Sequence, residues 1–442
     1  MKSEFECYNQ HEENVTATIQ EFNSQLSKRL LEKDIGKKLV YQDNDSWVQL
    51  WPGAYVYAAY MDKTNTSDWQ IRIISIVSRH ATPENSVQCW LSVGSAVFLS
   101  RATLKVLPEH HDRPFGAAFF LCPVKFRSEM YDQEIIRVAL GTDWNMTSPK
   151  WLNVHQRQRT PPIFCSVCVR PIVGLSDKMS LIAEFIAYYS SMGIGSFNLY
   201  LCEVPRDVEL LLLHLKDTTK VNIQLYRWNL HMNKSTIHEY GQLAALQDCF
   251  YRSRLTSEYV VSVDFDEFLV PKTRETLTEA LLEIETSVGK KSLGSILVKN
   301  RFFCYEYPAY TAFLTQKPPL LTRILFIHEV GVWKYRERSK YVARPTAVVV
   351  SGVHFVWQHL KGTREVAISE AVMVLQHYRA CCNVTKMNFW GSRDDEFLTE
   401  ERVVADTSIH RHLKKMIHSD VIGSLKLLVE EPLKELPSYT DD

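Results

Sequence analysis

Residues 38–160 carry short apolar runs separated by loops rich in Pro, Gly, Asn and Asp. Four of these runs have the length and the β-branched or aromatic content that predict strands. They are residues 55–60, 71–77, 87–93 and 117–124. Residues 1–37 are polar and predict at most one helix, between Thr16 and Lys33. We therefore expect a smaller β-rich N-terminal domain over residues 38–160, preceded by a polar lead-in or stem over residues 1–37.

From residue 163 onward, apolar runs alternate with stretches in which apolar residues recur at helical spacing. The expected strands are residues 163–169, 196–201, 221–226, 259–263, 295–298 and 347–350. The expected helices are residues 176–192, 207–215, 240–255 and 277–284, with a helix-like stretch over 370–375. This alternation is typical of an α/β fold with a mostly parallel central sheet and right-handed crossovers. We expect such a domain over residues 161–400 and a C-terminal helical tail over residues 401–442.

Charge and glycine motifs exclude several classes of protein. Lys plus Arg and Asp plus Glu are both 51, so the chain lacks the positive excess that is typical of nucleic-acid-binding proteins. Neither G-x-G-x-x-G nor G-x-x-x-x-G-K-[ST] follows an expected strand. These motifs mark Rossmann dinucleotide enzymes and P-loop ATPases, so both classes are disfavoured. A diphosphate bound to this sheet therefore needs a metal ion to neutralise much of its charge.

Three carboxylates, Asp264, Asp266 and Glu267, follow the expected buried strand 259–263. In an open α/β sheet, ligands bind outside the carboxyl ends of the strands. Two acids at positions i and i+2 of an extended chain point to the same side, and carboxylate oxygens suit a hard divalent cation that also bridges to phosphates. Helix capping is the alternative, but acids further along already serve the next helix. We predict a metal–diphosphate site at Asp264 and Asp266.

Candidate partners of these acids lie elsewhere in the chain. Lys340 belongs to a basic stretch that fits an exposed strand equally well. His354 follows a strand and a glycine, which suits metal coordination, although a lone histidine is more often structural. Arg379 has the forked donors that bind phosphate, but it also fits the basic C-terminus of a helix. Cys165 and Cys168 lie in one strand and face opposite ways, so we expect structural thiols or half-cystines and no zinc site.

The sequence gives opposing signals about the cellular compartment. Six N-x-S/T sequons and ten cysteines favour the secretory pathway, with some disulfides. The sequons lie at Asn14, Asn44, Asn65, Asn145, Asn233 and Asn383. Against this, residues 1–40 contain no apolar targeting segment, and no run reaches the ~18 apolar residues of a membrane span. We expect either the soluble part of a longer product or a cytosolic protein.

Short motifs in a defined order give the chain a family resemblance. They are Cys168-Val169-Arg170-Pro171, Glu184-Phe185-Ile186, Gly241-Gln242, Asp248-Cys249, Asp264 to Pro271, Lys340 to Pro345, Gly352-Val353-His354 and His377-Tyr378-Arg379. In this order and spacing they resemble glycosyltransferase family 92, over roughly residues 165–385. The resemblance implies a GT-A-type (Rossmann-like) nucleotide-sugar transferase domain. It also implies UDP-galactose as donor and a divalent metal, usually Mn²⁺.

The family resemblance extends to substrate and location. The chain is similar to β-1,4-galactosyltransferases, and the animal members act on fucose of N-glycan cores. This implies inverting transfer of galactose to a glycan acceptor. Members are typically type II membrane proteins, so a place in the Golgi lumen is implied, although no membrane anchor is visible here and a secreted product also fits.

On this reading the expected site residues take three roles. The metal ligands are Asp264, Asp266 and His354. The residues that frame the donor nucleotide and its diphosphate are Arg170, Gln242, Asp248, Lys340 and Arg379. An inverting transfer also needs a base for the acceptor hydroxyl. The candidates are Glu267, Glu306 and Glu329, and the sequence does not rank them.

Three other functions stay open at this point. The first is a transferase of another UDP-sugar, such as UDP-GlcNAc or UDP-glucose. The second is a sugar-binding protein whose catalytic half has decayed, which the intact motifs argue against. The third is a metal-dependent phosphohydrolase, since paired acids and a cation also suit that chemistry.

Overall fold

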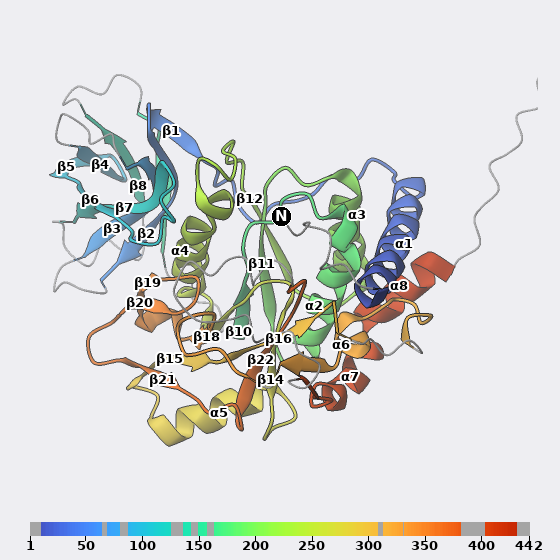
Figure 1. Ribbon diagram of the computed structural model, residues 1–442. Coiled ribbons are helices and arrows are strands. Elements are labelled where there is room, and N and C mark those ends of the chain that lie inside the picture. The colour runs from blue at the N-terminus through green and yellow to red at the C-terminus, as the bar shows by residue number, and fades with distance from the viewer. Residues whose placement is uncertain are drawn as a thin grey trace, which may run out of the picture.

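A computed structural model of the chain describes residues 10–63, 69–79, 87–124, 136–142, 149–156, 163–307, 313–329, 331–381 and 403–430 (Figure 1). The sequons at Asn65, Asn145 and Asn383 and the cysteines Cys7 and Cys382 lie outside these ranges. None of the described helices is long and apolar enough to span a membrane.

The apolar runs of the N-terminal part pair into a nine-stranded sheet within the described residues, here called the N-terminal sheet. Its strands are β1 (Val48–Trp51), β2 (Ala54–Asp62), β3 (Gln70–Ser78), β4 (Gln88–Val93), β5 (Ala96–Arg101), β6 (Thr103–Val106), β7 (Phe115–Pro123), β8 (Ile136–Gly141) and β9 (Leu152–His155). They lie in the order β5-β4-β8-β9-β2-β3-β7-β6, and β1 pairs with β2. The four strands expected here are all present. A disulfide, Cys89–Cys122, joins β4 to β7.

The strands that follow residue 163 form a central sheet of seven strands in the described part of the chain. They are β10 (Ile163–Cys168), β11 (Ser196–Leu201), β12 (Ile223–Arg227), β13 (Ser257–Ser262), β15 (Leu293–Val298), β18 (Lys340–Ala343) and β21 (Arg364–Ala367). Their order is β12-β11-β10-β13-β18-β15-β21. The first four run parallel, and β18 is antiparallel to both β13 and β15. This confirms a mixed α/β architecture.

Helices cover both faces of the central sheet (Figure 1). They are α1 (Gln10–Glu32), α2 (Met179–Ser191), α3 (Arg206–Thr218), α4 (Gln242–Ser253), α5 (Leu277–Val288), α7 (His410–Ile417) and α8 (Asp420–Glu430). α4 lies between the central and the N-terminal sheets, whereas α1, α2, α3 and α8 gather on the opposite face. Phe22 and Leu26 of α1 are buried in the core that α2 also enters. Part of the expected lead-in is therefore packed against the α/β domain.

The N-terminal sheet shares a hydrophobic core with α4. Tyr57 and Phe119 of the sheet pack in one cluster with Phe250 of α4, and all three are fully buried. Burial of one such side chain contributes roughly 1.5–3 kcal/mol. The Cys168–Cys249 disulfide then ties α4 to β10, so Cys168 is a half-cystine and Cys165 a buried free thiol. The two sheets are thus joined through α4.

A smaller sheet has the order β14 (Glu267–Pro271), β22 (Met373–Arg379) and β16 (Asn300–Cys304). The expected helix over residues 370–375 is wrong, because Leu375 lies in β22 and pairs with Leu269 of β14. A short apolar run does not distinguish a buried strand from a buried helix. The remaining elements are α6 (Leu321–Ile324), β17 (Ile327–Glu329), β19 (Val348–Ser351), β20 (Val356–His359) and β23 (Val403–Ala405).

Candidate functional site

The three acids of the 264–267 segment lie at a tight turn between β13 and β14. The backbone N–H of Glu267 donates to the carbonyl of Asp264 over 3.1 Å, which closes the turn. The segment is therefore a turn and not the extended chain expected from the sequence. Asp264 and Asp266 are partly exposed, whereas Phe265 and Glu267 are buried. The two aspartates thus share the open side of the turn.

Lys340 is the buried cation beside this turn. Its Nζ donates to Asp264 Oδ2 over 2.8 Å and lies 3.4 Å from Glu267 Oε2. Its side chain is 2% exposed, which corrects the alternative of an exposed strand, because β18 pairs on both edges within the central sheet. Burial would lower the pKa of Lys340, but the two carboxylates raise it overall. Burial also opposes ionisation of Asp264, yet Lys340 and Arg170 lower its pKa.

His377 holds the other side of the turn. Its Nε2 lies 3.5 Å from Asp266 Oδ2, and its Nδ1 lies 3.5 Å from Glu267 Oε1. Burial opposes ionisation of Asp266, but His377 and Arg170 lower its pKa. Burial raises the pKa of Glu267, whose Oε2 accepts the backbone N–H of Asp264 over 2.8 Å. The buried Glu267 carboxylate therefore stabilises the turn through its hydrogen bond to the Asp264 backbone.

The position of His377 was missed from the sequence. The sequence offers two alternative roles for Arg379, phosphate binding and the basic C-terminus of a helix, and no separate role for His377. In β22, alternate side chains face opposite sides of the sheet, and the register places His377 opposite Glu267. Arg379, two residues further along and so on the same face as His377, pairs with Cys304 of β16, and its guanidinium carbon lies 5.2 Å from the centroid of the Phe302 ring.

Arg170, at the carboxyl end of β10, also reaches the turn. Its charge lowers the pKa values of both Asp264 and Asp266, and its Nη1 donates to Glu239 Oε2 over 3.0 Å. Glu239 begins a run of three positive φ angles, 40°, 54° and 81°, that ends at Gly241. Strained non-glycine residues of this kind cluster at functional sites.

Gln242 follows this strained run as the first residue of α4. Its Nε2 donates to Asp264 Oδ1 over 3.4 Å. Three of the five expected donor-site residues, Arg170, Gln242 and Lys340, therefore surround the two aspartates. The α4 helix and the strand ends bring them together from sequence positions far apart.

His354 lies in the loop between β19 and β20. Its Nδ1 is 3.2 Å from the carbonyl oxygen of Ser339. A carbonyl only accepts, so Nδ1 carries the proton and Nε2 keeps a lone pair. Burial, and then the charge of Lys340, lower the pKa of His354 to about 3, so the ring is neutral near pH 7. Asp264 also acts on this ring electrostatically, which places His354 on the Lys340 side of the turn.

Asp248 has contacts of a different kind. Its carboxylate is fully buried and accepts hydrogen bonds from the Tyr60 hydroxyl over 2.5 Å and the Tyr200 hydroxyl over 2.6 Å. Arg252 Nε donates to it over 3.2 Å. These groups join α4 to the N-terminal sheet and to β11, so the contacts of Asp248 are structural.

The candidate bases differ in their surroundings. Glu306 is 8% exposed, and its Oε1 accepts the backbone N–H of Cys381 over 2.7 Å, next to the Cys304–Cys381 disulfide. Its neighbour Tyr305 lies near Asp266, as described below. Glu329 ends β17, which pairs with β23. Glu267 supports the turn through its backbone contact.

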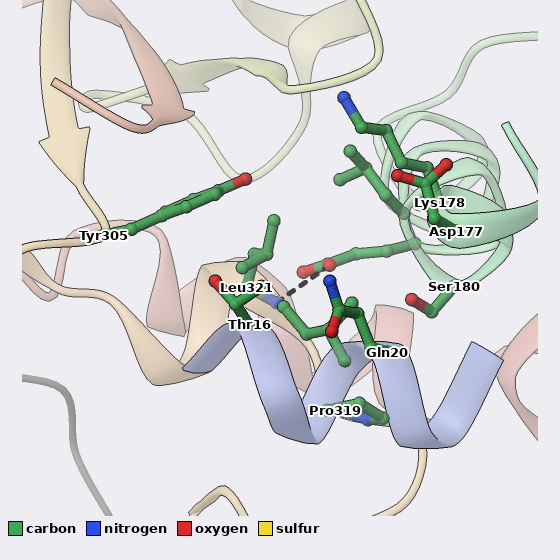
Figure 2. Close-up of a pocket in the computed structure, with 11 residues that line it drawn as sticks. Thr16, Gln20, Asp177, Lys178, Ser180, Tyr305, Pro319 and Leu321 are labelled. Carbon is green, nitrogen blue, oxygen red and sulfur yellow. Dashed lines mark hydrogen bonds between the residues drawn. The ribbon is translucent and has the colours of Figure 1, made fainter. Parts of the chain in front are cut away.

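A cavity of about 100 Å³ lies between α1 and α2 (Figure 2). Tyr305 and Lys178 lie on opposite sides of it, and Gln20 of α1 lies between them. Lys178 lowers the pKa of Asp266, while burial and then the charge of Asp266 raise the pKa of Tyr305. Both side chains therefore lie within electrostatic range of that aspartate. Glu184 also lines the cavity, where its carboxylate accepts two backbone N–H groups over 2.9 Å each.

Asp264, Asp266 and His354 carry the kinds of donor atom that bind a hard divalent cation. Asp264 and Asp266 offer ionised oxygens on the open side, and His354 offers Nε2 with its tautomer fixed by Ser339. In the described residues, the ligand atoms of these three side chains are not all within 4.8 Å of one another. Lys340 is the cation that Asp264 contacts in this arrangement.

Known proteins are similar to this chain over most of its α/β part. The model of Glycosyltransferase family 92 matches residues 164–420, more than half of the 442-residue chain. A Caenorhabditis elegans protein named beta-1,4-galactosyltransferase is 22% identical over 362 residues, 77% of this chain and 78% of that protein. A family 92 protein of Oryza sativa subsp. japonica is 25% identical over 229 residues, 51% of this chain and 35% of that protein. Another family 92 protein of Caenorhabditis elegans is 21% identical over 215 residues, 47% of this chain and 40% of that protein.

Proposed function

This chain belongs to glycosyltransferase family 92, and we propose that it transfers galactose from UDP-galactose to a glycan hydroxyl, with inversion and in a β-1,4 linkage. Family membership makes it a glycosyltransferase, with a nucleotide-sugar donor and a glycan acceptor. The name of the Caenorhabditis elegans relative supports galactose. The observation that carries the proposal is the pair of ionised aspartates, Asp264 and Asp266, on the open side of the turn. A GT-A-type fold, fucose of an N-glycan core as acceptor and a Golgi-lumenal location belong to the same proposal.

The chain's own groups are suited to bind and orient a diphosphate. Arg170 presents a forked guanidinium beside both aspartates, a geometry that matches phosphate oxygens. Lys340 orients Asp264, and His377 orients Asp266. Asp264, Asp266 and His354 are proposed to hold Mn²⁺ or a similar cation, which when bound stabilises negative charge on the leaving UDP as a Lewis acid.

The acceptor sugar is proposed to bind in the cavity between Lys178 and Tyr305. Two of its lining residues, Lys178 and Tyr305, interact electrostatically with Asp266, which supports a sugar site on the Asp266 side of the proposed diphosphate site. The Tyr305 ring offers an apolar face, and Gln20 and Lys178 offer hydrogen-bond donors to hydroxyls. Glu306 is the candidate base that adjoins Tyr305 along the chain.

The donor and metal are tested in one array. Purified protein is incubated with UDP-galactose, UDP-GlcNAc or UDP-glucose and a panel of glycan acceptors, with Mn²⁺ or with chelator, and UDP release and glycan mass are measured. We expect galactose transfer that chelator abolishes, and a loss of about 100-fold or more in Asp264→Asn. Asp217→Asn, at an exposed ion pair on α3, is the matched control and should transfer normally.

Each contrary result of the array points to a different function. Full activity of Asp264→Asn would remove the metal role from this turn. Turnover of another UDP-sugar alone would correct the donor. Mn²⁺-dependent UDP binding without transfer to any acceptor would indicate a decayed, sugar-binding protein, and phosphate release without acceptor would indicate a phosphohydrolase.

The base is tested separately with Glu306→Gln. Loss of a positioned base costs roughly 100-fold or more in rate, so transfer should fall by that factor. UDP binding, measured by calorimetry, should stay unchanged, because Glu306 Oε1 accepts the backbone N–H of Cys381 beside the Cys304–Cys381 disulfide. An unchanged transfer rate would move the base to another side chain.

A further inference from the structure

The loop that carries His354 is held from two sides. Within the α/β domain, the Tyr341 hydroxyl donates to the Gly352 carbonyl over 2.8 Å, and Gln247 bonds to both backbone groups of Ser351. From the N-terminal sheet, Glu109 reaches across to the same loop. Its Oε2 accepts the backbone N–H of Val353 over 3.0 Å and the indole N–H of Trp357 over 2.9 Å.

The loop backbone also packs closely against Trp357 at Gly352. A Cβ at Gly352 would lie 2.3 Å from the Trp357 ring and 2.6 Å from the Phe355 carbonyl oxygen. The glycine thus lets the backbone pass directly under Trp357, whose indole N–H is fixed by Glu109. A charged acceptor makes stronger hydrogen bonds than a neutral one, so Glu109 fixes the residue that immediately precedes His354.

The segment that holds Glu109 contacts the other side of the site as well. Glu109 lies between β6 and β7, in residues 107–114. In the same segment, the His111 ring stacks on His238 with centroids 3.7 Å apart, and directly after it, at the start of β7, Phe115 N donates to the Thr236 carbonyl over 3.1 Å. Residues 236–238 lead directly into the strained run at Glu239, which pairs with Arg170.

We propose that Glu109 is a positioning residue for His354, so that the N-terminal sheet supplies part of the scaffold of the metal site. The inference rests on the proposed function, because it takes His354 as a metal ligand. Groups that orient a metal ligand typically change metal affinity by 10–100-fold when they are lost. The N-terminal sheet then contributes to the metal site of the transferase.

The test measures Mn²⁺ affinity by electron paramagnetic resonance, with and without UDP and without any acceptor. In Glu109→Ala we expect Mn²⁺ affinity to fall by about ten-fold or more, toward the value of His354→Ala. Glu109→Gln, which keeps an oxygen acceptor at the same place, should recover most of the affinity. Trp357→Phe, which removes one donor and leaves the bond to Val353, should lie between them.

The controls separate a positioning role from a loss of folding. Asp112→Asn lies in the same segment, at a left-handed position that asparagine tolerates, and its side chain is 96% exposed. It should bind Mn²⁺ as the unaltered protein does. If Glu109→Ala does not fold, the step from Glu109→Gln to Trp357→Phe still decides the question. Equal affinity in all these variants, with a loss only in His354→Ala, overturns the role of Glu109. Absence of Mn²⁺ binding by the unaltered protein overturns both this role and the metal part of the proposed function.

Discussion

Two clusters in this molecule have nearly the same composition but opposite character. The turn cluster consists of Asp264, Asp266, Glu267, Lys340 and His377. The junction cluster consists of Asp43, Asp45, Asp248, Arg252 and His155. Each has three acids, one permanent cation and one histidine. The counts of charged residues therefore do not tell which cluster binds a ligand.

The two clusters differ in how the cation meets the acids. Arg252 contacts all three acids of the junction cluster, with 3.0 Å to Asp45 and 3.2 Å to Asp248, and it also bonds to Asp43. Its guanidinium occupies the place where a metal ion would be sought, since Asp43, Asp45 and His155 have ligand atoms within 4.8 Å of one another. A buried arginine that satisfies its acids leaves little for a ligand.

In the turn cluster the cation is buried and two of the three acids are partly exposed. Lys340 is 2% exposed and contacts Asp264 and Glu267, while the Asp266 side chain is 32% exposed. The positive charges of Arg170 and Lys178 also lower the pKa of Asp266. Lys340 thus leaves part of the Asp264 and Asp266 side chains exposed, whereas Arg252 contacts every acid of the junction cluster.

The largest expected effect is the loss of Arg252. Arg252→Met leaves the buried Asp248 and the partly buried Asp43 and Asp45 without their shared cation, and removal of one partner from a buried ion pair costs about 3–5 kcal/mol. Urea unfolding should show this loss. Lys37→Met is the control: its ion pair with Asp217 is exposed, so the expected loss is below about 1 kcal/mol. Equal, small losses in both variants would mean that Arg252 does not hold the junction.

The second-largest expected effect is a loss of transfer activity when an acid of the turn cluster is changed. Asp266→Asn should lower transfer by roughly 100-fold or more, as loss of a metal ligand removes several kcal/mol from transition-state stabilisation. Its stability should change by less than about 1 kcal/mol because the side chain is partly exposed. Asp45→Asn, the matched change in the junction cluster, should do the reverse. If both variants lost activity alike, the distinction between the clusters would fail.

The sequence predicted the turn cluster better than the junction cluster, for a physical reason. Asp264, Asp266 and Glu267 are neighbours in the chain and follow a recognisable strand, so one local pattern reveals them. Arg252 and Asp45 are 207 residues apart, and no local pattern connects them. Asp248 was assigned to the donor site on its motif alone, and its tyrosine partners come from distant strands.

The same reasoning explains the remaining differences. The strands of the N-terminal sheet and of β10 to β13 were predictable because their apolar runs are flanked by turn residues. His377 was missed because Met373 to Leu375, buried by β14 on one edge and β16 on the other, has no helical or alternating signature. The role of Glu109 depends on a contact 244 residues along the chain, which only the fold supplies.

The smallest expected effect concerns His155, the histidine of the junction cluster. His155 Nε2 lies 2.6 Å from Asp45 Oδ2, and its ring stacks on Tyr60. His155→Phe keeps the stacked ring but removes this bond, which should cost about 1 kcal/mol in urea unfolding at pH 7. Transfer activity should stay unchanged, because none of these groups belongs to the turn cluster.

The free energy of unfolding should also depend on pH differently in the unaltered protein and in His155→Phe. Burial raises the pKa of Asp45, but the His155 bond and Arg252 lower it overall. An acid whose folded-state pKa is depressed contributes stability above its ordinary value of about 3.9, and that contribution is lost as the pH falls through the folded-state value. The unaltered protein should therefore lose stability below about pH 4 more steeply than His155→Phe, which has less of this contribution to lose. Parallel curves of unfolding free energy against pH for the two proteins would show that His155 does not lower the pKa of Asp45. Arg252 would then be the group that keeps Asp45 ionised.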